Sequence, residues 1–233
     1  MRLLTLLLML LALGVAGCGD DDDDEGDSGS TTPADTQTQT TAEKPQKQGG
    51  CFEVAQPEPR PDGGEEKPTA PLSGEYTVTF ETNCGSFTVD MDEQVGGLSA
   101  ASFVQLADSG FYEGTFFHRI ATGFVIQGGD PTGTGTGGPG YSTVDTPAAD
   151  TTYTNGVVAM AKTGAEAPGT AGSQFFVVTA DDAGLPPDYA VVGRVVAGLD
   201  VVDAIGQLGD PASGGEGVPL QPVVIESAEL AER

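Results

Sequence analysis

From about residue 72 onward, the chain is a succession of short apolar runs, rich in β-forming residues and separated by glycine, proline, asparagine and aspartate. Alternation on both sides of Asn83-Cys84-Gly85 is typical of a β-hairpin over residues 76–91. Further strand-like runs lie at 115–120, 124–127, 156–160, 173–179, 190–196 and 222–226. Helical spacing occurs over 98–109 and 199–208. Many short strands with two helices favour a closed antiparallel barrel or sandwich over a parallel α/β fold.

The start of the chain has a different character. A basic Met1-Arg2 precedes a continuous apolar run over 3–16 that is shorter than the ~20 residues a spanning helix needs, and we interpret 1–17 as a signal peptide. Its end, Val15-Ala16-Gly17-Cys18, resembles the lipobox of bacterial lipoproteins. The resemblance implies that Cys18 is lipidated and becomes the new N-terminus. The alternative is an ordinary secretory signal in which Cys18 has no role. In both cases we expect the chain to work outside the cytoplasm. If Cys18 is lipidated, we expect the chain to be anchored at the outer face of a membrane.

Residues 18–71 predict a stalk. An acidic run from Asp20 to Asp24 is followed by Ser, Thr, Gln, Pro and Gly, with few large apolar residues. Such a segment buries too little surface to offset its chain entropy, so we expect it to stay extended and disordered. It would hold a single folded domain, 72–233, away from the membrane.

The charge balance excludes one class of partner. The chain has 9 Lys+Arg and 35 Asp+Glu, a formal net charge of −26. Nucleic-acid binding needs clustered basic residues, so no nucleic-acid partner is expected. Strong self-repulsion is consistent with a soluble, monomeric domain.

The three cysteines indicate a covalent link. If Cys18 carries lipid, Cys51 and Cys84 remain as a pair in an oxidising compartment, where disulfides persist. A bond between them would pin the end of the stalk onto the domain. The alternative is two free thiols.

Elimination removes several kinds of catalysis. The chain has one histidine, His118, whereas a catalytic zinc draws on several His or Cys ligands, so neither a metal nor a cofactor is expected. A Ser-His-Asp hydrolase would also depend on His118, and no GxSxG motif supports it. Residues 135–140 match GxGxxG, but Pro139 lies inside the motif and no helix start follows. We interpret this stretch as a long mobile loop.

Two stretches carry a specific resemblance. Residues 116–130 read Phe-Phe-His-Arg-Ile-Ala-Thr-Gly-Phe-Val-Ile-Gln-Gly-Gly-Asp, and downstream come Val-Ala-Met-Ala-Lys-Thr-Gly at 158–164 and Gly-Ser-Gln-Phe-Phe at 172–176. Both resemble the hallmark segments of the cyclophilin family of peptidyl-prolyl cis-trans isomerases. The resemblance runs from about Gly74 to Glu229. It implies a mainly β fold, an eight-stranded closed antiparallel barrel capped by two helices.

The resemblance also implies a set of site residues. Arg119 matches the catalytic arginine, and Gln127 matches the glutamine that positions the substrate carbonyl and the arginine. The apolar walls of the proline pocket correspond to Phe124, Val125, Phe176 and Leu185. Gln174 and the backbone of Ala161 and Lys162 match positions that pair with the substrate main chain. Tyr189 stands at the rim where many eukaryotic members carry histidine, and Gly184 where they carry tryptophan; the chain has no Trp, which puts tight binding of cyclosporin in doubt.

Arginine suits this reaction physically. An X–Pro bond isomerises slowly because amide resonance must be broken, with a barrier of ~18–20 kcal/mol. A donor aimed at the prolyl nitrogen meets an available lone pair only after resonance is lost, so its hydrogen bond favours the transition state. No nucleophile or general base is required.

Other readings of the same residues stay open. Phe124 and Phe176 could be core aromatics, Arg119 a surface ion-pair residue, and Gln127 an ordinary polar group at a strand end. His118 alternates with Arg119, so we expect it to face the other way as a hydrogen-bonded structural residue. The function we expect is isomerisation of Xaa-Pro bonds in exported polypeptides, assisting their folding. The alternatives are a module or chaperone that binds proline-containing peptides with little turnover, and an envelope scaffold. A pure binder would not need Arg119, which favours the enzyme.

Overall fold

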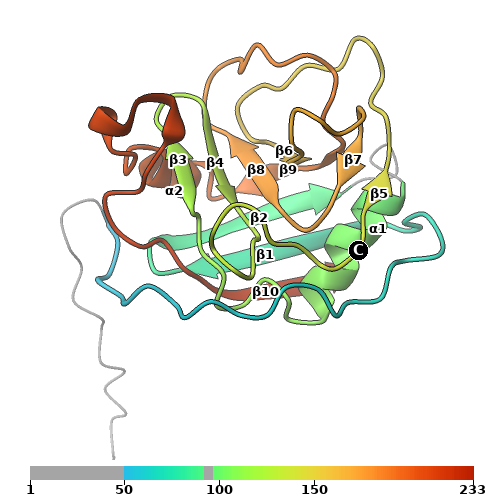
Figure 1. The fold of residues 1–233 in the computed structure, drawn as a ribbon, viewed down its shortest axis with the longest axis horizontal. Coiled ribbons are helices and arrows are strands. Elements are labelled where there is room, and N and C mark those ends of the chain that lie inside the picture. Colours follow the sequence, from blue (N-terminus) through green and yellow to red (C-terminus); the bar gives the residue numbers. More distant parts are fainter. Residues whose placement is uncertain (1–49, 92–96) are drawn as a thin grey trace, which may run out of the picture. The chain divides into compact units, whose positions relative to one another are not determined.

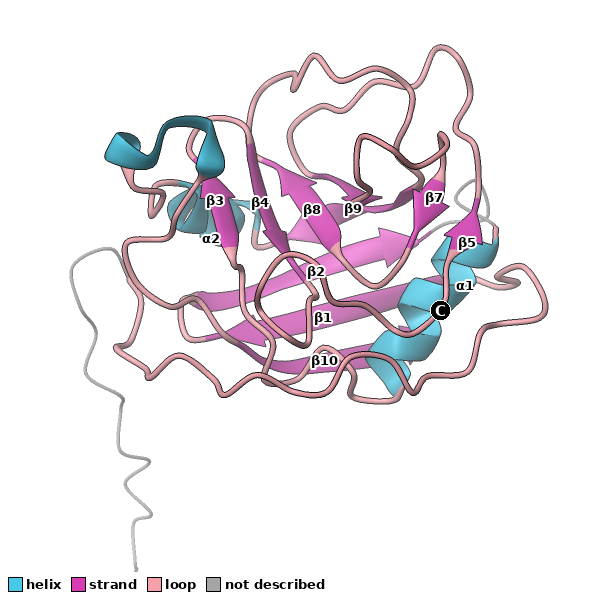
Figure 2. Ribbon diagram, viewed as in Figure 1, coloured by secondary structure: helices cyan, strands magenta, loops and turns pink. Residues whose placement is uncertain are grey.

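A computed structural model describes residues 50–91 and 97–233. The elements in chain order are β1 Tyr76–Thr82, β2 Gly85–Met91, α1 Leu98–Asp108, β3 Arg119–Ala121, β4 Val125–Gly128, β5 Thr143–Val144, β6 Val157–Met160, β7 Thr170–Ala171, β8 Phe175–Val178, β9 Val191–Ala197, α2 Leu199–Gly206, the 3-10 helix η2 Pro211–Glu216, and β10 Ile225–Glu232. Figure 1 shows their arrangement, and Figure 2 separates helices from strands and loops.

Eight strands form one curled antiparallel sheet. Their order is β10-β1-β2-β9-β6-β8-β4-β3, and β5 and β7 form a separate two-stranded sheet. Helix α1 packs against β10, β9 and β1, while α2 packs against β2, β4 and β3 (Figure 1). The mainly β fold with eight antiparallel strands and two helices predicted from the sequence is confirmed.

The sheet closes less completely than the predicted barrel. In the described part of the chain, the edge strands β3 and β10 do not share a ladder; the residues just before them form a single bridge, Phe116 with Val224. Two backbone bonds support this bridge, from the amide of Phe117 to the carbonyl of Val223 and from Ile225 to Thr115, both at 2.9 Å. The architecture is therefore a half-barrel whose edges meet at one short contact.

Two strands begin three or more residues later than expected, and the others differ by one or two residues. The run at 115–120 becomes a strand only at Arg119, because its first residues make the closing bridge instead. The last strand begins at Ile225 rather than at residue 222 and continues through polar residues to Glu232. Apolar patterning missed this extension because most side chains of β10 are exposed or half-buried. The short strands β5 and β7, which both follow the expected loop at 135–140, were also missed.

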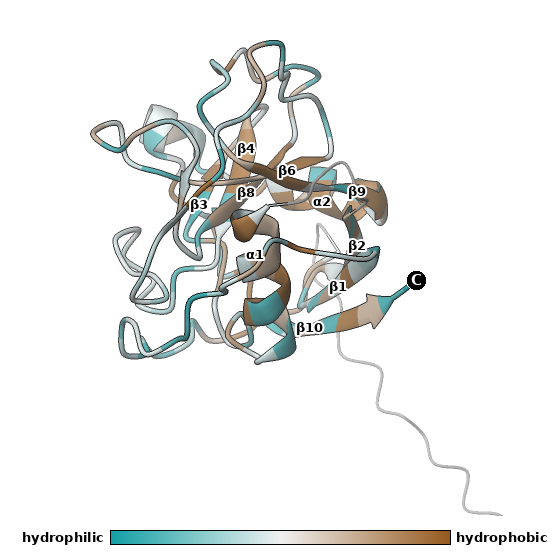
Figure 3. Cartoon of the chain, turned by 90° about the vertical axis from the view of Figure 1, so that its right-hand side faces the viewer, coloured by the Kyte–Doolittle hydropathy of each residue, from teal (hydrophilic) through white to brown (hydrophobic). Residues whose placement is uncertain are grey.

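The core is built around packed aromatic rings. Phe175 in β8 packs against Phe80 with the rings tilted and meets Phe103 edge-on, with ring centroids 5.4 Å apart in both pairs. The buried Tyr112 hydroxyl donates to the carbonyl of Ser173 at 3.2 Å, and burial raises the pKa of Tyr112 well above its usual value. Figure 3 shows that the apolar residues concentrate in the sheet and α1, whereas the long loops are hydrophilic. Because Phe175 points into this core, its neighbour Phe176 points to the other face of the sheet.

Residues 51–72, here called the strap, lie against the domain. A disulfide joins Cys51 to Cys84. The amide of Phe52 donates to the carbonyl of Asn83 at 2.7 Å, and the Asn83 side chain donates back to the carbonyl of Phe52 at 2.7 Å. The sequence predicts an extended, disordered stalk over 18–71, with a Cys51–Cys84 disulfide that would pin its end onto the domain. The disulfide is present, and backbone hydrogen bonds also attach the strap to the folded domain, so this part of the predicted stalk lies against the domain.

Other predictions about the N-terminal region fall outside the described residues. These are the signal peptide 1–17, lipidated Cys18 and the stalk before residue 50. Within the described ranges, no helix combines the length and apolar character needed to traverse a bilayer.

Candidate active site

Four side chains on neighbouring strands share one row across the sheet. Arg119 of β3 lies opposite Gln127 of β4, Gln127 opposite Phe176 of β8, and Phe176 opposite Ala159 of β6. Residues directly opposed in an antiparallel sheet project to the same face. The adjacent row, Ile120, Ile126, Val177 and Val158, is fully buried in the core. The first row therefore faces outward and forms the floor of a site.

A pocket of about 230 Å³ opens over this floor, and we call it the arginine pocket. Its lining combines one guanidinium with apolar and aromatic side chains. The lining residues are Arg119, Phe124, Val125, Gln127, Ala161, Lys162, Phe176, Leu185 and Tyr189. These are nine of the ten residues that the resemblance implied for catalysis and substrate binding.

Three aromatic rings shape the apolar end of this pocket. Phe176 meets Tyr189 edge-on, with ring centroids 5.4 Å apart. Tyr153 packs against both at 6.3 and 5.9 Å, and its hydroxyl donates to the carbonyl of Tyr189 at 2.7 Å while accepting from the Tyr189 amide at 2.9 Å. Burial raises the pKa of Tyr153, although the hydrogen bond that its oxygen accepts from the Tyr189 amide opposes this. Tyr153 thus holds the rim residue in place, a role that no local motif indicated.

Arg119 is held at the mouth of the pocket by two contacts. Its guanidinium carbon lies 5.7 Å from the centroid of the Phe124 ring, within the range of a cation–π interaction. One terminal nitrogen donates to the carbonyl of Gly215 in η2 at 3.0 Å. Burial lowers the pKa of Arg119 and the Tyr189 hydroxyl raises it, but the guanidinium stays charged at neutral pH. The contact to Gly215 was not predicted, because every residue has a backbone carbonyl and a sequence motif does not show which one accepts a hydrogen bond.

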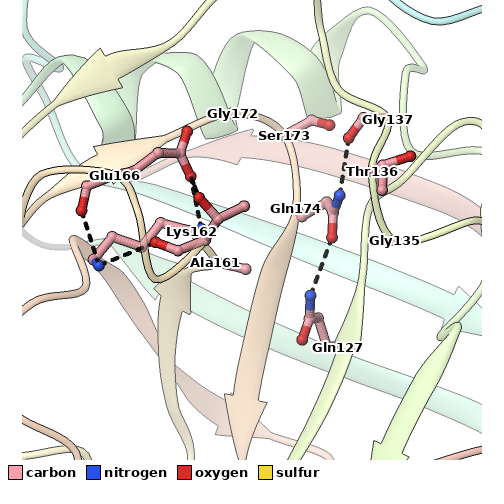
Figure 4. A pocket seen from close by; sticks show the side chains of 11 residues that line it. Gln127, Gly135, Thr136, Gly137, Ala161, Lys162, Glu166, Gly172, Ser173 and Gln174 are labelled. Carbon is pink, nitrogen blue, oxygen red and sulfur yellow. Dashed lines mark hydrogen bonds between the residues drawn. The ribbon is translucent and has the colours of Figure 1, made fainter. Parts of the chain in front are cut away.

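Two glutamines connect this pocket to a glycine-rich loop. The Gln127 side chain donates from Nε2 to Oε1 of Gln174 at 3.0 Å, and Gln174 Nε2 donates to the carbonyl of Gly137 at 2.9 Å (Figure 4). The amide of Ala161 donates to the carbonyl of Gln174 at 2.8 Å. Any pairing of Ala161 with a substrate main chain must therefore use its carbonyl.

A second pocket of about 240 Å³, which we call the polar pocket, adjoins the arginine pocket; Figure 4 shows the residues that line it. It shares Gln127, Ala161 and Lys162 with the arginine pocket. Its remaining lining residues are Gly135, Thr136, Gly137, Thr163, Glu166, Gly172, Ser173 and Gln174. The two pockets thus form one groove with Lys162 in the shared wall.

The side chain of Lys162 contributes to that wall, although only its backbone was expected to matter. The side chain is 5% exposed, and Nζ lies 4.0 Å from a carboxylate oxygen of Asp188. The ammonium donates to the carbonyl of Glu166 at 3.3 Å and stands 5.3 Å from the ring centroid of Tyr189. It therefore links its own loop, through Glu166, to the segment that carries Asp188 and Tyr189.

His118 lies behind the site, beside Gly135 of the glycine-rich loop. Its Nδ1 is buried and has no hydrogen-bond partner among the described residues, so the hydrogen-bonded histidine expected from the sequence is not seen at this nitrogen. Burial lowers the pKa of His118; the nearby Asp130 carboxylate raises it and Arg119 lowers it further.

Asp130 organises the glycine-rich loop, residues 131–140, that forms one wall of the polar pocket. Its carboxylate accepts hydrogen bonds from the Thr132 amide and hydroxyl at 2.7 and 2.9 Å, and from the amides of Gly135 and Gly137 at 2.6 and 3.2 Å. Burial alone would raise the pKa of Asp130, but these bonds outweigh it and lower the pKa. The stretch first interpreted as a mobile loop is a hydrogen-bonded wall.

Together, the fold and groove define a class: a curled β-sheet protein with an open surface groove, in which an arginine stands over an apolar pocket. Comparison with known proteins assigns the family. The family model described as "Cyclophilin type peptidyl-prolyl cis-trans isomerase/CLD" matches residues 77–230. The chain therefore belongs to the cyclophilin-type peptidyl-prolyl cis-trans isomerase family.

Individual relatives agree with this assignment. Peptidyl-prolyl cis-trans isomerase B of Streptomyces anulatus is 38% identical over 180 residues, 70% of this chain and 100% of that protein. Peptidyl-prolyl cis-trans isomerase-like 1 of Aspergillus oryzae is 38% identical over 159 residues, 66% of this chain and 95% of its own length. The crystal structure of a Cryptosporidium parvum cyclophilin type isomerase superposes with a TM-score of 0.60 at 29% identity, covering 68% of this chain and 99% of that one. The protein is thus a peptidyl-prolyl isomerase by homology and fold.

Proposed function

We propose that this protein isomerises Xaa-Pro bonds of exported polypeptides at the outer face of a membrane, to which lipidated Cys18 tethers it. The observation that carries the enzymatic part is the placement of the Arg119 guanidinium over Phe124, at the mouth of an apolar pocket. The C. parvum relative was also solved in the presence of the dipeptide Ala-Pro, and that structure superposes with a TM-score of 0.59 at 29% identity. This supports a dipeptide-sized subsite here.

The proposed mechanism uses the pocket to hold the proline ring. Phe124, Phe176 and Leu185 line its apolar part. Burying the ring there leaves the preceding carbonyl free to rotate toward solvent. As the amide twists, the prolyl nitrogen becomes pyramidal and gains a lone pair. An N–H of Arg119 donates to that lone pair, and because the lone pair is absent from the planar ground state, the bond lowers the barrier selectively.

Preorganisation of Arg119 matters because it avoids an ordering cost during the reaction. A guanidinium has five N–H donors, and the carbonyl of Gly215 occupies one of them. The remaining donors can face the pocket. Gln127, directly opposite Arg119 in the sheet, is itself fixed by Gln174 and is placed to bind the substrate carbonyl.

Export is supported by two features of the chain. The apolar run ends at Val15-Ala16-Gly17-Cys18, and an acidic, polar segment follows directly. The Cys51–Cys84 disulfide suits an oxidising compartment, where such bonds persist. Clients would therefore be polypeptides that emerge unfolded from the export machinery, with Xaa-Pro bonds still isomerising slowly.

The enzymatic proposal is tested by a proline-isomerisation assay with the mature, disulfide-bonded chain and a chromogenic Xaa-Pro tetrapeptide. Acceleration above the uncatalysed rate supports it. Peptide binding without acceleration would instead favour the binding-module alternative.

The tether is tested separately with Cys18→Ser in the full-length precursor. We expect the parent to partition into the detergent phase and the variant to be released or to remain unprocessed. Unchanged membrane attachment and processing of Cys18→Ser would contradict the lipoprotein proposal while leaving the enzymatic one intact.

A further inference from the structure

The strap runs along the outside of the glycine-rich loop. The Arg60 amide donates to the carbonyl of Pro131 at 2.8 Å, Gly63 to Gly138 at 3.0 Å, and Glu65 to Pro139 at 3.1 Å. In return, the Gly138 amide donates to the Asp62 carboxylate at 2.6 Å. The backbones approach closely, since a Cβ added to Gly140 would lie 3.0 Å from the Cα of Gly63. Strap and loop are therefore joined by direct backbone hydrogen bonds.

The strap itself is fixed at both ends. The disulfide and the Asn83 bonds hold its start at Cys51 and Phe52. At its other end, the Gln105 side chain in α1 donates to the carbonyl of Glu66 at 2.5 Å, and the amide of Leu72 donates to the carbonyl of Gly97 at 3.1 Å. A segment anchored in this way can impose its position on whatever pairs with it.

The loop needs such support. Residues 131–140 read Pro-Thr-Gly-Thr-Gly-Thr-Gly-Gly-Pro-Gly, and glycine loses more conformational entropy on ordering than any other residue. Asp130 holds the inner side of the loop through Gly135 and Gly137. Asp62 accepts from the next amide, Gly138, on the outer side. Two carboxylates thus hold consecutive glycines from opposite sides.

The same short stretch of loop faces the substrate groove. Gly135, Thr136 and Gly137 line the polar pocket. The carbonyl of Gly137 accepts from Gln174, which in turn accepts from Gln127 at the shared wall of the two pockets (Figure 4). A continuous chain of hydrogen bonds therefore runs from the strap, through one peptide unit of the loop, to the side chain opposite Arg119.

We propose that Asp62 is a positioning residue for the isomerase reaction: it fixes the Gly137–Gly138 peptide and thereby the wall of the polar pocket that a substrate longer than a dipeptide contacts. This rests on the proposed function and extends it, because it makes the strap part of the substrate site. The arginine pocket has no lining residue from this loop in the described part of the chain. Loss of Asp62 should therefore affect long peptides and spare binding of a proline dipeptide.

Three variants of the mature, disulfide-bonded chain test the proposal. Asp62→Ala removes the acceptor, Asp62→Asn keeps an oxygen acceptor without charge, and Glu58→Ala removes an exposed carboxylate from the same strap. For a tetrapeptide or longer Xaa-Pro substrate, we expect Asp62→Ala to raise KM about three- to tenfold with kcat unchanged, the range of one net hydrogen bond. Asp62→Asn and Glu58→Ala should resemble the parent. Ala-Pro, used as a competitor, should inhibit all four proteins equally.

A second readout is independent of turnover. Amide hydrogen exchange over 131–140 should accelerate in Asp62→Ala and stay at the parent rate in Asp62→Asn. Unchanged exchange and unchanged KM in Asp62→Ala would overturn the proposal, and so would equal KM effects in Asp62→Ala and Glu58→Ala, which would reveal a charge effect. An inactive parent would refute the proposed function, whereas exchange would still decide whether Asp62 fixes the loop. A lower melting temperature with unchanged KM would mark Asp62 as merely structural.

Discussion

Arg119 and Gln127 are cross-strand partners, directly opposed in the β3–β4 ladder, so the guanidinium and the amide leave the same face of the sheet. Gln127 is in turn opposed to Phe176 in β8. The donor that we propose for the prolyl nitrogen, the group that we propose for the substrate carbonyl and an apolar floor are thus set side by side by strand register. A shift of one residue in β3 would replace Arg119 with Ile120, a core residue, and remove the donor from the groove.

Arg119→Ala should keep the fold and peptide binding but lose most turnover. A hydrogen bond from a charged donor is worth about 1.5–3 kcal/mol, which corresponds to a loss of roughly 10- to 150-fold in kcat/KM at ~1.36 kcal/mol per tenfold. Arg119→Lys should restore little, because an ammonium lacks the planar, preorganised donor set. The measurement is the proline-isomerisation assay, with circular dichroism to check the fold.

Arg194→Ala is a charge-matched control, since Arg194 lies on β9 and donates to the carbonyl of Asn155. It should isomerise at the parent rate. If Arg119→Ala were also as fast as the parent, the mechanism would be wrong even though the family assignment stands, and the binding-module alternative would gain support.

Phe176→Ala should weaken substrate capture and destabilise the domain. Phe176 is 4% exposed and contacts both Tyr153 and Tyr189, so truncation leaves a cavity under the pocket. We expect a higher KM, with a loss of about 3–5 kcal/mol in the free energy of unfolding. Phe176→Leu keeps more side-chain volume, so its KM should rise less and its free energy of unfolding should fall less than in Phe176→Ala. Urea unfolding and peptide kinetics on the same samples separate the two effects, and a Phe176→Ala variant with parent KM would exclude the ring from substrate binding.

Replacing both Cys51 and Cys84 with serine should lower stability. The bond closes a loop with a sequence separation of 33 residues, and the chain-entropy relation gives about 3–4 kcal/mol for a loop of that size. Urea unfolding of the double variant, compared with the oxidised parent, measures the difference. The oxidised parent should also show no free thiol at these positions, and two reactive thiols in the non-reduced mature protein would contradict the pairing.

Stability should fall as pH decreases below the ordinary pKa of His118. Burial lowers the pKa of His118 in the folded state below 6.5, so the unfolded chain binds more protons over the window between the lowered pKa and 6.5. The contribution of neutral His118 is fully present above pH 6.5 and is lost as pH falls through this window. In His118→Gln, the midpoint of urea unfolding should depend less on pH within this window. If the pH dependence of the midpoint is the same as in the parent, His118 is not its cause.

Asp130 contributes a second, separate loss at lower pH. Its folded-state pKa is lowered from 3.8, so its stabilising effect is present above 3.8 and is lost as pH falls toward the lowered value. In the His118→Gln variant, this lower transition should remain, and Asp130→Asn should remove it.

Local patterns were sufficient for most of the regular elements. The hairpin over 76–91 was predicted correctly because alternation and a turn signal are both short-range. Helix α1 was expected over 98–109 and ends at Asp108, with Gly110 just beyond it at a φ of 74°. Strand β10 was misplaced because its polar edge residues carry little apolar signal. Strands and helices were thus predicted correctly where the spacing of apolar residues marks them.

The sequence by itself determined most of the strands, the two helices, the family resemblance and, through it, the residues that line the arginine pocket, because alternation and the motif spacings are local properties of the chain. The tertiary structure then separated the two neighbouring phenylalanines: Phe175 packs in the main core, whereas Phe176, already matched to the pocket wall by the resemblance, packs in the second cluster under the groove. It alone brought Gly215 to Arg119, across 96 residues, and Asp62 to Gly138, across 76. Such contacts depend on the register of the sheet and on the paths of the loops. Because they end on backbone carbonyls and amides, which every residue carries, no pattern of side chains could have indicated them.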